Sequence, residues 1–230
     1  MTASNFWIER FASEFIPQIK RYRRIWKERL LPAIGDLELE ANAIEQEELR
    51  RLATSHDGPD DWRADDIAEQ AHEAGLEHFL EFAPFQQGLI NMYVVGLFHF
   101  IEQQCVLFYR EAGGTEQRRL EFDRVKDWLD EHDVHICKFN SWPMLEKLML
   151  AANCVKHGDG ISCEKLRKKE PDWFKYTIDD LPELLPSLRR PIQQPLFGQG
   201  IYLREATLWE LTDAALTFWD ELGVALACWT

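Results

Sequence analysis

The sequence predicts an all-α fold, an up-and-down bundle of four to five long helices. Apolar residues recur every three or four positions over most of the chain, which is the spacing of one face of a helix. Pro and Gly stand between these stretches and mark where helices end. With 230 residues, of which 46% are hydrophobic, the chain is long enough for one sizeable core. We therefore expect a single helical domain over residues 1–230.

The first predicted helix covers residues 4–31 and has one apolar face. Its apolar positions are Trp7, Phe11, Phe15, Ile19, Tyr22, Trp26 and Leu30. Pro17 is expected to kink this helix, and Pro32 to end or bend it. Residues 36–54 follow as an acidic amphipathic helix, and residues 55–60 have the composition of a turn.

The middle of the chain predicts the centre of the bundle. A helix over residues 62–83 is punctuated by Pro84, and residues 85–110 form the most apolar helix, which Gly113 and Gly114 stop. Thr115 is expected to cap a shorter helix that reaches about residue 131. Pro143 suits the first turn of the next helix, which ends at His157.

The segment from 159 to 200 is predicted to be an irregular, Pro-rich insertion packed on the bundle. It contains five prolines, too many for another bundle helix, yet it is too rich in Trp, Phe and Leu to be plainly disordered. Residues 174–178 and 201–203 favour two short strands. A Trp- and Leu-rich helix from 205 to about 228 completes the predicted fold.

Composition excludes several classes of function. Forty acidic residues against 26 basic ones give a net charge of −14, which argues against unspecific attraction to nucleic acid or anionic membranes. Any contact with RNA must therefore be local. The five Cys form no CxxC pair and so indicate neither a zinc ribbon nor a disulfide framework. No signal peptide or membrane-spanning run is visible, and we expect a cytoplasmic protein without a membrane partner.

The most informative stretch is the end of the helix over residues 143–157. There the apolar pattern gives way to Asn153, Lys156 and His157, which share the last helical turn. Gly158 supplies a natural helix stop. Two interpretations stay open: these side chains form a catalytic group, or Asn153 and His157 only cap the helix and form hydrogen bonds at its end.

This helix end, together with the helical architecture, resembles the HEPN superfamily. Active members have an Arg, often followed by a polar residue, and a His four to six positions after that Arg. Asn153 matches the polar position and His157 matches the His, but the positions expected for Arg are Ala152, Ala151 and Leu150. The resemblance implies a homodimeric, metal-independent endoribonuclease or RNA-binding protein of toxin or antiviral-defence type. An inactive member that binds a partner protein is the alternative.

Metal-free RNA cleavage explains which side chains are needed. A proton leaves the 2′-hydroxyl, another reaches the leaving 5′-oxygen, and a cation stabilises the charge on the phosphate. We assign proton transfer to His157, positioning to Asn153 and the cationic role of the missing Arg to Lys156, with no cofactor. Further RNA contacts are expected from a basic run in the following segment, or from a partner subunit. That run is Arg167, Lys168 and Lys169.

Two other polar patterns have alternative interpretations. Six basic residues between 20 and 29 are interleaved with Tyr22 and Trp26, which suits a phosphate backbone, but the aromatics fall on the apolar face. A solvated face that pairs with the acidic residues of 36–48 is therefore favoured. His99 and Glu102 interrupt the most apolar helix, so we expect an internal hydrogen-bond network or a supporting position beside His157.

Metal binding is a weaker hypothesis. Glu69 and His72 form an ExxH motif, and His99 and Glu102 form the same motif in reverse order. Together they are compatible with a carboxylate metal site in a helical bundle. A diiron bundle needs ExxH on two helices, and the chain has one. We expect no metal.

Overall fold

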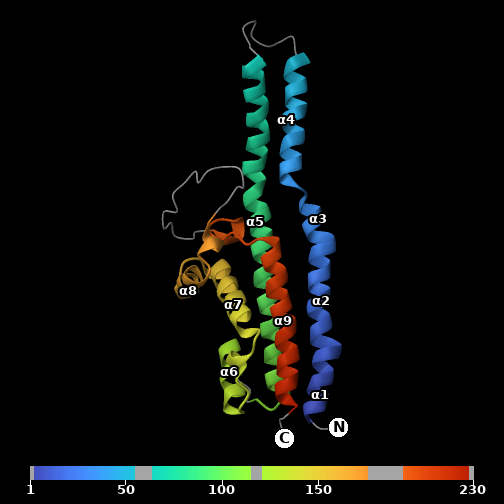
Figure 1. The fold of residues 1–230 in the computed structure, drawn as a ribbon, viewed down its shortest axis with the longest axis vertical. Helices are drawn as coiled ribbons and strands as arrows, with labels where there is room; N and C mark the ends of the chain where they lie inside the picture. Colours follow the sequence, from blue (N-terminus) through green and yellow to red (C-terminus); the bar gives the residue numbers. More distant parts are fainter. Residues whose placement is uncertain (1–2, 55–63, 115–120, 176–193, 228–230) are drawn as a thin grey trace.

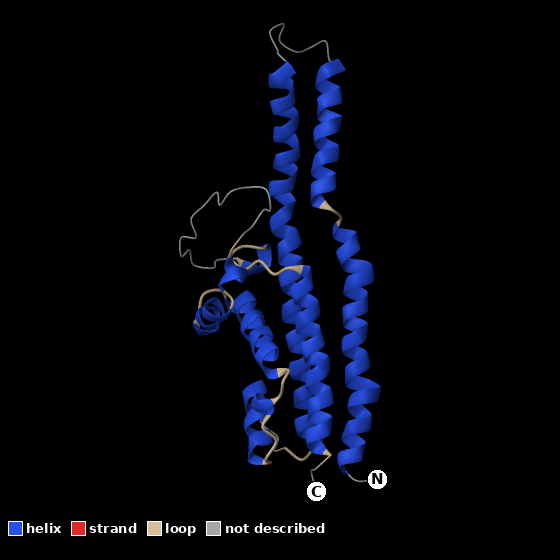
Figure 2. Ribbon diagram, in the orientation of Figure 1, coloured by secondary structure: helices blue, strands red, loops and turns tan. Residues whose placement is uncertain are grey.

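The computed structural model describes residues 3–54, 64–114, 121–175 and 194–227, and they form an elongated bundle of helices (Figure 1). The predicted all-α class is confirmed. Figure 2 shows helices joined by loops, with no strand in the part of the chain that is described. In that part no helix is long and apolar enough to cross a bilayer.

The N-terminal helix runs on through both of its prolines. It consists of α1 (Ala3–Arg10), α2 (Ile16–Ile25) and α3 (Leu31–Ile34), joined by two wider π-helical turns, Phe11–Phe15 and Trp26–Leu30. Each π turn closes directly before a proline, through a bond from the N–H of Ile16 to the carbonyl of Phe11 and from Leu31 to Trp26. The wider turn accommodates the proline ring and its missing N–H. Pro32 therefore does not end the helix; Gly35 does, with φ of 81°.

Helices α4 (Leu37–Thr54) and α5 (Ala64–Glu111) form an antiparallel hairpin that extends beyond the rest of the bundle (Figure 1). Asp36 caps α4, because its Oδ1 accepts a hydrogen bond from the N–H of Leu39 at 3.2 Å. The helices approach closely at Gly75, where a Cβ atom would lie 2.7 Å from the carbonyl oxygen of Ala41. A glycine at this position lets the two backbones touch.

Pro84 does not interrupt α5, contrary to the prediction that a helix ends there. One helix of 48 residues continues through it. The proline removes a single backbone hydrogen bond, and tertiary contacts from α4 and from the turn Pro195–Phe197 offset that loss. The turn packs so closely that a Cβ on Gly198 would lie 2.0 Å from the carbonyl oxygen of Pro84.

The C-terminal half adds four helices around α5. They are α6 (Phe122–Glu131), α7 (Trp142–His157), α8 (Ile161–Lys169) and α9 (Glu205–Leu226). Helix α9 packs against α1, α2, α5 and α7, and α8 packs on the side of α7 that faces away from α5 (Figure 1). The fully buried aromatic side chains Trp219, Phe11, Phe15 and Phe108 meet where α1, α5 and α9 come together.

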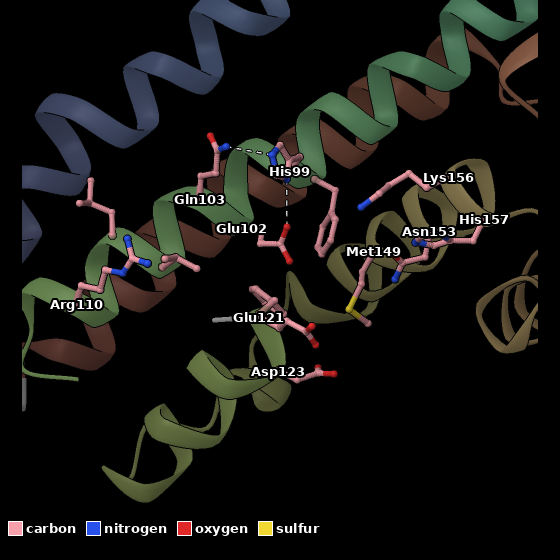
Figure 3. Close-up of a pocket in the computed structure, with 14 residues that line it drawn as sticks. His99, Glu102, Gln103, Arg110, Glu121, Asp123, Met149, Asn153, Lys156 and His157 are labelled. Carbon is pink, nitrogen blue, oxygen red and sulfur yellow. Dashed lines mark hydrogen bonds and ion pairs between the residues drawn. The ribbon is translucent and has the colours of Figure 1, made fainter. Parts of the chain in front are cut away.

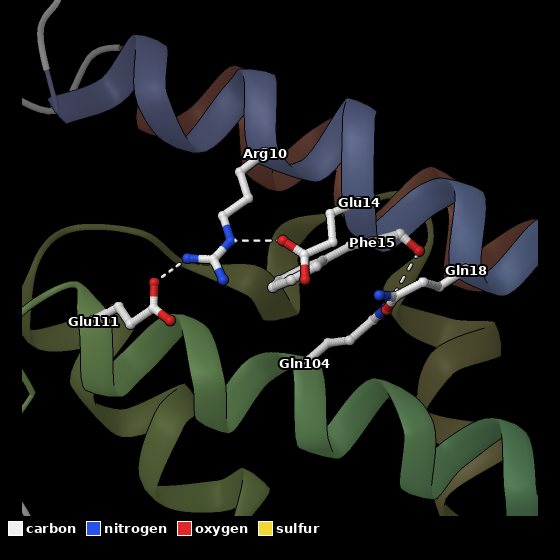
Figure 4. Close-up of polar contacts among 6 residues, drawn as sticks. All are labelled: Arg10, Glu14, Phe15, Gln18, Gln104 and Glu111. Carbon is white, nitrogen blue, oxygen red and sulfur yellow. Dashed lines mark hydrogen bonds and ion pairs between the residues drawn. The ribbon is translucent and has the colours of Figure 1, made fainter.

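Polar links join the first helix to α5 at the edge of this core (Figure 4). Arg10 forms ion pairs with Glu14, at 2.9 Å, and with Glu111 on α5. Deeper in the contact, the amide nitrogen of Gln104 donates to the carbonyl oxygen of Phe15 at 3.2 Å and to the side chain of Gln18 at 3.0 Å. These contacts fix the register of the first helix along α5.

The segment from 159 to 200 is more regular than predicted. It contains α8 and two short 3₁₀ turns, Pro171–Phe174 and Pro195–Phe197, while residues 176–193 lie outside the described part. The two predicted strands are wrong where they can be checked: residues 201–203 are extended, and a single backbone hydrogen bond joins Tyr202 to Trp173, at 2.7 Å. One bond is not a ladder, which requires a repeating series.

Candidate functional site

An open cleft of about 620 Å³ lies between the C-terminal third of α5, the start of α6 and the end of α7 (Figure 3). It contains all three side chains singled out on α7, Asn153, Lys156 and His157, and also His99 and Glu102 of α5. Its apolar wall consists of Phe98, Val106, Leu107, Phe122 and Met149. The structure therefore brings together residues that are more than 50 positions apart in the sequence.

Helix α7 is held at its first turn by α9. Glu221 of α9 accepts hydrogen bonds from the backbone N–H of Ser141 at 3.1 Å and from its hydroxyl at 2.6 Å. Partial burial raises the pKa of Glu221, but the bonds from Ser141 and Asn140 outweigh it and leave the pKa below its usual value. Gly158, with φ of 68°, ends the helix. Lys156 and His157 are exposed, so solvent and ligand reach both.

The position of the missing Arg faces the core. Ala152 is 0% exposed, as is its neighbour Ala151. A guanidinium at residue 152 would be buried among apolar side chains rather than placed in the cleft, at a large cost in desolvation. The packing of α7 therefore excludes the Arg of the HEPN motif, and Lys156 is the cation that this turn presents instead.

Cys154 lies in the same turn and takes no part in the cleft. Its thiol is fully buried, and that burial raises its pKa far above the usual range. It lies beside the thiol of Cys163 of α8, whose Sγ donates to Oδ1 of Asp159 at 3.5 Å. The contact holds α8 against α7, and the thiol is not a nucleophile.

His99 is held by two neighbours on α5. Gln103 Nε2 lies 3.0 Å from His99 Nε2, and His99 Nδ1 lies 3.2 Å from a carboxylate oxygen of Glu102. Because an amide nitrogen only donates, Nε2 of His99 accepts, and Nδ1 donates its proton to Glu102. The expected internal network thus exists but is exposed to the cleft rather than sealed in the core. The neighbouring Gln104 points the other way, into the contact of Figure 4.

The cleft has mixed charge. Three carboxylates, those of Glu102, Glu121 and Asp123, line it with the two cations Arg110 and Lys156, giving a formal charge of −1 when both histidines are neutral. Figure 3 shows Lys156 and Glu102 pointing into the space between α7 and α5. Sequence reasoning missed Arg110, Glu121 and Asp123, since no motif or spacing connects them to the end of α7.

The predicted RNA-binding run on α8 is not part of this cleft. Arg167 lies 3.6 Å from Asp159 and stacks over the ring of Phe174 at 4.8 Å. Lys169 pairs with Glu146 at 2.9 Å, and Lys168 is exposed. None of the three lines the cleft. Within one chain they do not reach the cleft, because Cys163 and Leu166 pack α8 onto α7 with the basic side chains directed elsewhere. Their approach from a partner subunit stays a prediction.

The basic segment 20–29 is also not paired as predicted. Arg23 alone forms an ion pair among the described residues, with Asp213 of α9 at 2.6 Å. Four acidic residues of α4 pair within the hairpin instead, as in Glu40 with His78 and Glu45 with His72. The predicted pairing fails because α4 bends away at Gly35 and packs on α5 instead.

No three His, Cys, Asp or Glu side chains gather into a metal site in the described ranges. The two histidines of the candidate metal motifs, His72 and His99, lie 27 residues apart on one continuous helix. At 1.5 Å per residue that separation is about 40 Å. They cannot share a metal ion.

No protein-family model, curated protein or solved structure matches this chain. The resemblance to the HEPN superfamily stays a prediction from one motif and the helical architecture.

Proposed function

We propose that the cleft between α5, α6 and α7 is the active site of a metal-independent endoribonuclease. The observation that supports it is the presence of two exposed imidazoles, His99 and His157, with Lys156 and Asn153, around one open cleft. Two positioned acid–base groups and a cation are what metal-free cleavage of a phosphodiester requires. The resemblance of the α7 end to the HEPN motif points to the same chemistry.

The hydrogen bonds of His99 suit it to the role of base. Its Nδ1–H is directed to Glu102, which leaves the lone pair of Nε2 for the proton of the 2′-hydroxyl, in place of Gln103. The 2′-oxygen then attacks phosphorus and the bond to the 5′-oxygen breaks, giving a 2′,3′-cyclic phosphate. His157, protonated, donates a proton to the leaving 5′-oxygen. Lys156 offsets the charge on the phosphate, and the Asn153 amide donates a hydrogen bond to it.

The test is an RNA-cleavage assay in the presence of a chelator. His157→Ala and His99→Ala are each expected to lower the rate by about 10²–10⁴-fold, the usual contribution of a positioned acid or base. His72→Ala is the matched control, since His72 is an exposed histidine of α5 outside the cleft. A substrate whose scissile nucleotide lacks the 2′-hydroxyl should remain intact. Wild-type cleavage by His157→Ala would refute the proposal.

A non-catalytic interaction module is the second candidate, favoured by the formal charge of −1 in the cleft and by Ala152 at the position of the Arg. In that case the cleft binds a partner protein through its apolar wall and carboxylates. Absence of cleavage, together with an RNA affinity that Lys156→Glu leaves unchanged, would select this alternative.

A further inference from the structure

A row of unpaired cations lies on the outer side of the first long helix. Lys20, Arg21, Arg24, Lys27 and Arg29 are all exposed. None of them forms an ion pair with any residue that the structure describes. In a chain with net charge −14, a free group of five cations within ten residues is a marked local excess of positive charge. We name Lys20, Arg21, Arg24 and Lys27 the basic stripe.

The helix holds the basic stripe in a fixed orientation. Its inner side is anchored by Tyr22, whose hydroxyl donates to the carbonyl oxygen of Tyr93 at 3.0 Å, and by Trp26, whose ring packs against the same tyrosine. Arg23 is held by Asp213 and lies 5.3 Å from the ring of Trp209. With these side chains turned inward, the remaining cations face solvent.

The acidic hairpin of the same molecule does not neutralise the basic stripe. Four of its carboxylates on α4 pair with histidine or arginine within the hairpin, as in Glu48 with Arg51 at 2.6 Å and Glu45 with His72 at 3.2 Å. Opposite charges on neighbouring parts of a surface usually pair or mix. Residues 20–29 contain six basic residues and one carboxylate, the exposed Glu28, so the basic stripe keeps a net positive charge for another molecule.

We propose that the basic stripe binds the sugar–phosphate backbone of a nucleic acid without regard to sequence. Lys20, Arg24 and Lys27 follow the i, i+4, i+7 spacing of one side of a helix and span about 10 Å along its axis, at 1.5 Å per residue. One strand of a duplex places a phosphate about every 3.4 Å along the duplex axis, so a protein helix that lies parallel to this axis passes about three of them.

The aromatic side chains beside the basic stripe determine the mode of binding. Because Tyr22 and Trp26 pack against Tyr93, they offer no platform on which bases could stack. Contacts from Lys and Arg to phosphate position a nucleic acid but read no sequence. Interfaces between proteins have an apolar centre, whereas beside these cations Ile25 and Leu30 are exposed as single apolar side chains. The charge of the basic stripe therefore favours a polyanion as the partner.

The basic stripe is separate from the proposed active site. Helix α2 lies on one side of α5 and α9, and the cleft at α7 lies on the other (Figure 1). The inference rests on the proposed function only in that RNA is one of the nucleic acids bound. A backbone held at the basic stripe would tether a substrate to the molecule without occupying the cleft.

The experiment uses a labelled 20-base-pair DNA duplex, which lacks the 2′-hydroxyl and cannot be cleaved by the proposed chemistry. Its affinity for the full chain is measured by fluorescence anisotropy between 50 and 200 mM salt. Each phosphate contact contributes about 0.9 to the slope of log K against log salt concentration. The variant K20Q/R24Q/K27Q is expected to lower that slope by about 2 to 3. The control K126Q/K138Q/K165Q, which removes equal charge elsewhere, should keep the wild-type slope.

Each outcome is decisive. An unchanged slope in K20Q/R24Q/K27Q, with a helical spectrum like that of wild type, overturns the inference. So does a dimer at low salt in sedimentation that this variant abolishes while the duplex stays unbound, because the basic stripe then meets the acidic hairpin of a second copy. Binding of DNA through the basic stripe without RNA cleavage would support the inference and refute the proposed enzyme, so the two are tested separately.

Discussion

Asn91 joins the turn Pro195–Phe197 to the centre of α5, and its substitution is a direct test of the packing. The side chain is 0% exposed. Its Nδ2 donates to the carbonyl oxygens of Pro195 at 2.8 Å and Ile201 at 3.1 Å, and its Oδ1 accepts from Gln87 at 3.1 Å. One amide thereby satisfies two carbonyls from a segment more than 100 positions away.

Asn91→Ala is expected to lower the free energy of unfolding by about 2–4 kcal/mol. The carbonyl of Ile201 loses its donor, which costs about 1–3 kcal/mol, whereas the carbonyl of Pro195 keeps the N–H of Gly198 at 3.2 Å and loses one bond worth about 1 kcal/mol. Urea denaturation followed by circular dichroism measures the change, and hydrogen exchange should be faster across residues 195–203. Asn153→Ala is the matched control, because that side chain is half-buried in the open cleft.

The reasoning fails if Asn91→Ala costs less than about 1 kcal/mol and leaves exchange at 195–203 unchanged. Such a result would mean that water or a rearranged side chain replaces the amide. The turn would then be held by apolar contact alone.

Two further predictions concern the core and the support of α7. Phe108→Ala should lower the free energy of unfolding by about 3–5 kcal/mol, since the ring is fully buried against three other aromatic rings. The control Phe85→Ala should lower it by under about 1 kcal/mol, because Phe85 is 59% exposed. Equal losses in the two variants would contradict the packing. Glu221→Gln should lower it by about 1 kcal/mol at pH 7, screening included. Because the pKa of Glu221 is lowered in the folded protein, its ionised carboxylate stabilises the fold above the ordinary carboxyl pKa, and this stability is lost as pH falls through the pKa of the folded state. The difference in stability between Glu221→Gln and wild type should therefore shrink in acid. A constant difference from pH 7 to 3 would argue against a contribution from the charge of Glu221.

The helices were predictable because periodicity reports which side of a helix is buried. The end of α7 at Gly158 and the apolar face of the first helix follow from the sequence. Pro84 was misjudged because its effect is decided by tertiary contacts. A rule based on local sequence accounts for the missing N–H of proline. It does not account for the packing of α4 and of the turn at Gly198, which keeps α5 continuous.

The part of the candidate site that lies on α7 was predictable from the sequence, and the part that lies on α5 was not. The grouping of Asn153, Lys156 and His157 is local, so helical spacing placed them together. That His99 shares their cleft depends on the register of α5 against α7, which the sequence only suggests through the polar interruption of an apolar helix. The basic run on α8 was expected at the cleft and lies elsewhere. The direction of a short helix is set by the helices it packs on, not by its own charges, so the sequence alone did not predict where these side chains point.

The continuous helix α5 connects two distant parts of the molecule. Its 48 residues amount to about 72 Å at 1.5 Å per residue, and they join the far tip of the hairpin to the wall of the cleft that holds His99. The backbone hydrogen bond that Pro84 cannot make leaves one point of lower bending stiffness about halfway along. The segment between Pro84 and the cleft carries His99, so a change in the direction of α5 at Pro84 would move His99 relative to His157.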